Sequence, residues 1–178
     1  MGYFVSGSGE FTIPASNIKA AYEAVVALND VPNAAKHGGT WSAGKEESRH
    51  FSWLPTDLRT IPTLQEIFTE MGFEVWDNET DGLTIHNFPN NKSGQEELFA
   101  AAVAPFVNSG GYFIWDGEDG EYWKWVFNNS EMSVHEGVRE YDPIGKSLTV
   151  LGYVHRETQR DAEFKKWMQS QEAVRSAT

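Results

Sequence analysis

The sequence predicts an α+β fold: a mostly antiparallel sheet from two helix–hairpin units, with helices packed on one face and a C-terminal strand and helix. The first observation is a set of short alternating runs separated by glycine- and aspartate-containing turns, as in β-hairpins. The second is a set of longer runs with apolar residues at helical spacing. Because hairpin strands pair in opposite directions, the sheet should be mostly antiparallel.

The start of the chain combines short strands with a helix. Tyr3–Val5 and Glu10–Ile13 are strand candidates, joined by a Gly/Ser link at Ser6–Gly9. The run 18–30 then carries apolar residues at intervals of three and four, which predicts an amphipathic helix.

The next segment is polar. Val31–Arg49 contains glycines and little apolar surface, so we expect a loop, and the most mobile part of the chain. His50–Leu54 alternates in polarity and predicts a short strand that Pro55 ends.

Two helix–hairpin units follow, at 62–91 and 95–129. In the first, a helix stops at Gly72 and carries an apolar stripe on one face, made by Leu64, Ile67, Phe68 and Met71. A hairpin follows and turns at Asp81-Gly82. In the second, Pro105 should bend or end the helix, and an aromatic hairpin with an acidic tip comes next.

The two units resemble each other in order and in sequence. Four residues recur at a spacing of 39 positions, with Gly72, Phe73, Trp76 and Asp77 matching Gly111, Tyr112, Trp115 and Asp116. An internal structural repeat and chance similarity between two hairpin units both stay open.

The strand Tyr122–Phe127 is the most aromatic stretch of the chain. Alternation places Trp123, Trp125 and Phe127 on one face, which we expect to be core. The face with Tyr122 and Lys124 should then be half-exposed and available to a partner.

A third strand is expected at Glu131–Val138, and the chain then changes character. Residues 1–145 should form a single acidic domain, and 146–178 a strand at Leu148–Val154 plus an amphipathic helix. That helix has one apolar cluster, made by Phe164, Trp167 and Met168. The cluster either docks on the domain or meets a partner.

Charge and composition argue against several classes of function. Residues 1–145 hold 22 acidic and 8 basic residues, a net charge of −14, and residues 146–178 hold 4 and 6, a net of +2. An acidic body repels phosphate, so we expect no direct nucleic-acid binding. The charge serves either solubility or docking on a basic partner. The absence of cysteine, of a long apolar run and of a signal peptide predicts a cytoplasmic protein without membrane association.

The partial matches to catalytic and metal-binding motifs each lack a required residue. Gly39–Lys45 fits G-x-x-x-x-G-K, but Glu46 stands where a P-loop needs Ser or Thr. The stretch Asp77–Gly82 copies the start of a calcium loop whose twelfth position, Phe88, lacks the required glutamate. The histidines form no metal-binding pair. We therefore predict no catalytic residue, no metal ligand and no cofactor.

The remaining candidates are binding residues. The acidic hairpin tip is either a weak cation site or an ordinary polar turn. The predicted binding residues are Asp116, Glu118, Asp119, Glu121, Tyr122, Lys124, Phe164, Trp167 and Met168.

Three motifs carry a resemblance. Gly9–Pro14 (GEFTIP), Phe51–Pro55 (FSWLP) and Gly120–Phe127 (GEYWKWVF) resemble small proteins of actinobacteria and their phages that have no assigned activity. The resemblance covers roughly residues 9–138 and implies a phage-associated accessory protein. It implies no catalytic residue.

The leading hypothesis is a non-enzymatic, acidic protein-binding module that inhibits or redirects a host factor or a defence system. One alternative is a nucleotide- or sugar-binding protein, or an enzyme, with an aromatic-lined pocket. Another is a virion or assembly component, in which case the chain would form homo-oligomers.

Overall fold

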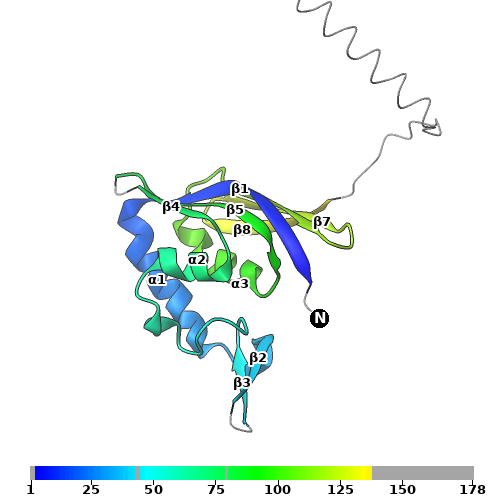
Figure 1. Cartoon of the computed structure of the whole chain (residues 1–178). Coiled ribbons are helices and arrows are strands. Elements are labelled where there is room, and N and C mark those ends of the chain that lie inside the picture. Colours follow the sequence, from blue (N-terminus) through cyan, green and yellow to red (C-terminus); the bar gives the residue numbers. More distant parts are fainter. Residues whose placement is uncertain (1–2, 43–44, 79, 138–178) are drawn as a thin grey trace, which may run out of the picture. The chain divides into compact units, whose positions relative to one another are not determined.

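The computed structural model describes residues 3–42, 45–78 and 80–137, with the backbone alone at 40–42 and 45–47 (Figure 1). The chain divides into two compact units, Met1–Arg139 and Glu140–Thr178. The second lies outside the described residues. The predictions for Leu148–Val154 and for Phe164, Trp167 and Met168 lie there too.

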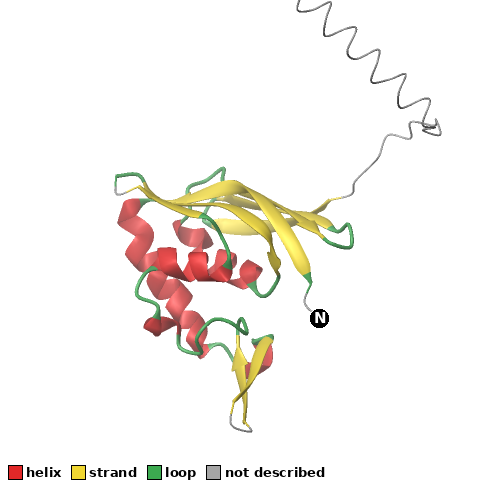
Figure 2. Ribbon diagram, in the orientation of Figure 1, coloured by secondary structure: helices red, strands yellow, loops and turns green. Residues whose placement is uncertain are grey.

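The first unit is an α+β fold, as predicted, with a six-stranded antiparallel sheet in the order β4-β5-β1-β6-β7-β8. Its strands are β1 (Phe4–Ile13), β4 (Val75–Asn78), β5 (Gly82–Lys92), β6 (Tyr112–Gly117), β7 (Tyr122–Asn128) and β8 (Glu131–Gly137). The helices α1 (Ile18–Val26), α2 (Leu64–Met71) and α3 (Glu96–Val103) lie on one face of this sheet (Figure 2). We call this face the inner face and the opposite one the outer face.

Short 3-10 turns extend or join these elements. They span Ala15–Asn17, Ala27–Asp30, Asn33–Ala35, Leu58–Thr60 and Ala104–Phe106. The turn after α3 contains Pro105, and α3 ends just before it, as predicted.

Local sequence signals define both ends of α2. The Thr63 side chain accepts a hydrogen bond from the Glu66 backbone N–H at 3.1 Å and caps the helix. Gly72 ends it in the left-handed region, with φ of 113°. The predicted apolar stripe is buried, at Leu64, Ile67, Phe68 and Met71.

The N-terminal strand is longer than predicted. β1 is one ten-residue strand, and the Gly/Ser link Ser6–Gly9 lies inside it. β1 pairs with β6 in continuous register, whereas its register with β5 shifts on either side of Gly7. A Cβ on Gly7 would collide with the Phe113 ring, and one on Gly9 with the Tyr112 carbonyl. The glycines therefore permit a close, bulged strand in place of a break.

The prediction of a loop at Val31–Arg49 is wrong. This segment contains a small second sheet, in which β2 (Gly38–Ser42) pairs antiparallel with β3 (Lys45–Arg49). Strand pairing satisfies the backbone groups of a segment that has little apolar surface.

The strand predicted at His50–Leu54 is also absent from the structure. His50 and Phe51 are consecutive and both buried, which a strand with one exposed face does not allow. The His50 ring instead bridges two elements, with Nε2 at 2.9 Å from the Leu28 carbonyl and Nδ1 at 3.1 Å from Gln95 Oε1.

β5 runs further than predicted. The composition of Asn90–Gly94 is typical of a loop, but Asn91 and Lys92 pair with Val5 and Phe4 of β1. Pairing with a partner strand therefore overrides the local turn composition.

The two helix–hairpin units lie on either side of β1, with β4 and β5 on one side and β6 and β7 on the other. Residues matched by the 39-residue spacing face opposite ways. Trp76 is 62% exposed, whereas Trp115 is 1% exposed. The order of elements is shared, and an internal structural repeat and chance similarity both stay open.

Candidate functional site

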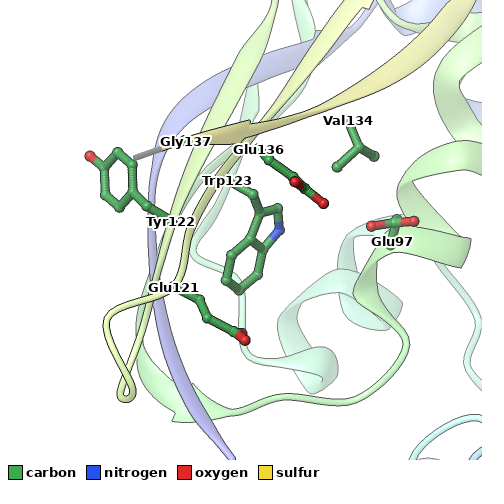
Figure 3. Close-up of a pocket in the computed structure, with 7 residues that line it drawn as sticks. All are labelled: Glu97, Glu121, Tyr122, Trp123, Val134, Glu136 and Gly137. Carbon is green, nitrogen blue, oxygen red and sulfur yellow. The ribbon is translucent and has the colours of Figure 1, made fainter. Parts of the chain in front are cut away.

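A recess opens on the inner face where β7 and β8 extend past the start of α3 (Figure 3). Its volume is about 510 Å³. We call it the acidic recess, and its described lining consists of Glu97, Glu121, Tyr122, Trp123, Val134, Glu136 and Gly137.

Strand register brings the lining together. Trp123 of β7 lies opposite Glu136 of β8, and Trp125 lies opposite Val134. Alternation turns these four side chains to the inner face. Figure 3 shows Trp123 and Glu136 on the side where Glu97 of α3 lies. Three separate elements thus supply one surface.

Trp123 lies at the edge of the aromatic core. Its ring stacks on Trp115 with centroids 5.8 Å apart and planes 8° apart. Trp115 belongs to β6, on one side of β7, and Glu136 belongs to β8, on the other. The second face of the Trp123 ring is therefore turned toward β8 and the recess. Trp123 is half-buried, in contrast to the fully buried Trp115 and Trp125.

A smaller pocket of about 150 Å³ adjoins the recess and shares Glu97 and Trp123 with it. We call it the inner pocket, and its described lining is Ser93, Gly94, Glu96, Glu97, Trp115, Trp123 and Trp125. The indole nitrogens of Trp115 and Trp125 are buried and have no acceptor among the described residues. An unpaired buried donor costs about 1–3 kcal/mol, so these two groups are a local cost to the stability of the aromatic core.

Glu96 is buried beside the inner pocket, at 5% exposure. Its carboxylate accepts hydrogen bonds from the Gly94 backbone N–H at 2.8 and 2.9 Å and from the Ser93 hydroxyl at 3.3 Å. Burial raises the pKa of Glu96, and the bonds from Gly94 and Ser93 oppose that rise. Glu96 thus fixes the chain entering α3.

The charged residues in the described lining of the acidic recess are all glutamates. Glu97, Glu121 and Glu136 line it, and its described lining includes no lysine, arginine or histidine. Within residues 3–42, 45–78 and 80–137, no group of three or more acidic, histidine or cysteine side chains could hold a metal ion.

The predicted tip residues have different roles. Glu118 accepts a hydrogen bond from the Phe4 backbone N–H, and Glu121 accepts one from the Tyr3 hydroxyl, both at 3.1 Å. These bonds tie the start of β1 to the hairpin. Burial and then the bond to Glu121 raise the pKa of Tyr3. Asp119 is exposed at the turn.

The predicted outer-face residues lie away from the recess interior. Lys124 Nζ lies 4.5 Å from the centre of the Tyr112 ring, a cation–π contact on the outer face. Asp116 lies opposite Tyr122 across the β6–β7 hairpin. Tyr122 borders the recess, but its ring points to the other side of the sheet (Figure 3).

The structure thus joins Glu121 and the edge of Tyr122 to residues that sequence reasoning missed. Trp123 was expected to be core, and Glu97 and Glu136 were not candidates. Alternation from Trp123 back to Glu121 was a usable signal for that pair. The positions of Glu97 and Glu136 depend on packing and register.

The motif matches take ordinary structural positions. In the G-x-x-x-x-G-K match, Gly39 lies in β2 and Lys45 begins β3, so a strand and not a helix follows the motif. Asp77–Gly82 spans the turn between β4 and β5, where Asp81 N–H donates to the Asn78 carbonyl at 3.0 Å. No helix in the described part of the chain has the length and apolarity to cross a membrane.

Comparison of the chain with protein-family models, with curated proteins and with solved structures gives no match.

Proposed function

We propose that this protein is a non-enzymatic binding module that docks a basic segment of a partner protein in the acidic recess. The observation that carries the proposal is the lining of that recess: three carboxylates around a half-buried tryptophan, with no cation among the described lining residues. Like charges in one concave site repel each other, and a bound cation relieves that repulsion.

The volume of the recess and the net charge of the protein support docking. A volume of about 510 Å³ lies within the range of ligand sites, roughly 300–1,000 Å³. The protein carries a formal net charge of −12, which attracts basic surfaces over a distance and speeds their encounter. The resemblance to small proteins of actinobacteria and their phages makes a host factor or a defence protein the favoured partner class.

A titration with labelled peptides tests the proposal. We expect a lysine- and arginine-containing peptide to bind the full chain, and an acidic peptide of equal length to bind at least about tenfold more weakly. Raising the salt concentration should weaken binding, because screening reduces the attraction. Fluorescence anisotropy at several salt concentrations measures both effects.

Matched variants locate the binding. Glu136→Gln removes one charge from the recess, and Glu131→Gln removes one from the outer face of the same strand. We expect Glu136→Gln to weaken peptide binding several-fold and Glu131→Gln to change it little. Equal effects of the two variants would show that only overall charge matters and would contradict a recess site.

A neutral sugar is the second candidate ligand. The half-buried Trp123 can pack against a sugar ring, and carboxylates can accept hydrogen bonds from hydroxyl groups. A nucleotide is a poorer candidate, because the same carboxylates repel phosphate. Sugar binding would be insensitive to salt, so the salt titration separates the two candidates.

A further inference from the structure

Trp123 and the carboxylates beside it line the same recess. We infer that the acidic recess holds an arginine side chain of the partner, with its guanidinium group stacked on the face of Trp123 turned toward β8. This inference rests on the proposed function and names the group that is recognised.

Stacking favours a flat cation. Trp115 covers the β6-facing side of the Trp123 ring in a nearly parallel arrangement, with planes 8° apart. A planar guanidinium on the other side continues that stack, and tryptophan is the best aromatic partner for a cation. A lysine ammonium is a compact and strongly hydrated charge that gains less from a flat surface.

The carboxylates favour the same group. Glu136 is the register partner of Trp123 on β8, and Glu121 precedes Trp123 by two residues on the same face. Glu97 faces them from α3 (Figure 3). Guanidinium has five N–H donors in a fixed plane and can bond more than one carboxylate while it stacks. Lysine concentrates its donors at one point.

Four probes test the inference on the full chain. Three are nine-residue Gly/Ser peptides that differ at the central position, which is arginine, lysine or citrulline. The fourth is agmatine, which has the guanidinium group but no carbonyl. We expect the arginine peptide to bind about tenfold more tightly than the other three, measured by calorimetry at low salt.

Variants separate stacking from charge. Trp123→Leu should reduce the affinity for the arginine peptide about tenfold and bring it level with the lysine peptide. Glu136→Gln should weaken both peptides, and Glu131→Gln neither. If Trp123→Leu fails to fold, judged by circular dichroism, the citrulline peptide and Glu136→Gln still decide.

The outcomes distinguish the two levels of the proposal. If neither the arginine nor the lysine peptide binds, the proposed function itself is overturned. Equal binding of the two peptides, unaffected by Trp123→Leu, overturns the arginine inference and leaves the proposed function standing. Agmatine binding as tightly as the arginine peptide would overturn the assignment to an arginine side chain of a partner protein, because a free guanidinium would then be enough.

Discussion

Glu96 shows how one side chain can organise a helix start at an electrostatic cost. Its carboxylate holds Gly94 and Ser93 in place, while burial penalises its charge. Because its pKa is raised above that in the unfolded chain, the folded protein holds this proton more tightly. Its contribution to stability is therefore present at low pH and is lost as pH rises through the raised pKa.

Glu96→Gln should therefore gain stability relative to the native protein as pH rises from about 4 to about 7. Urea unfolding at several pH values measures the difference. Ala101→Ser is a suitable control, since it changes an exposed, non-titrating position in α3, and its effect should be constant with pH. A difference for Glu96→Gln that is also constant would contradict the electrostatic cost.

Trp115 and Trp123 lie side by side but should differ in what they contribute. Trp115 is 1% exposed at the centre of the aromatic core, whereas Trp123 is half-buried at its edge. Trp115→Ala should reduce the free energy of unfolding by about 3–5 kcal/mol, because a large cavity remains. Trp123→Ala should cost less than half as much while it weakens ligand binding. Comparable losses in denaturant titrations would show that Trp123 is mainly core.

At the scale of elements, β1 depends on its glycines. Gly9 adopts φ of +129°, and a Cβ there would meet the Tyr112 backbone oxygen of β6. Gly9→Ala should therefore lower stability by about 1–3 kcal/mol. Its exposed neighbour is the control, since Ser8→Ala should change stability by less than about 0.5 kcal/mol. Thermal unfolding of both variants tests this, and a tolerated Gly9→Ala would refute the close approach.

Local signals in the sequence decide which elements could be predicted. α2 has a cap at Thr63, a periodic apolar stripe and a stop at Gly72, all within one short run. The segment His50–Leu54 has no such local control. The His50 ring contacts Leu28 and Gln95, which are distant in sequence. The alternating polarity of the segment therefore predicted a strand that does not form.

For the whole molecule, the acidic charge should act on stability as well as on binding. A formal net charge of −12 makes the folded state repel itself, and salt screens that repulsion. Raising NaCl from about 0.05 to about 0.5 M should stabilise the protein by about 1 kcal/mol, which raises Tm by about 2–4 °C. Differential scanning calorimetry measures the shift. NaCl is preferable to sulfate, which also strengthens apolar burial. A Tm that falls with NaCl would contradict the prediction.

The candidate site could be predicted only in part. Alternation places Glu121, Trp123 and Trp125 on one face, and that pattern is visible in the sequence. Glu136 joins them through the β7–β8 register, and Glu97 through the packing of α3. Nothing in the spacing of these two glutamates marks them, so the sequence predicted neither as a binding residue.

By itself the sequence determined the α+β class, the three helices of the described region, the hairpins and the acidic character. Each of these depends on periodicity, turn residues or charge, which act over a few neighbouring residues or on the chain as a whole. The tertiary structure decided the bulged β1, the β2–β3 hairpin, the turn at His50–Leu54 and the recess around Trp123. These depend on contacts between distant segments, whose register and packing no local pattern specifies.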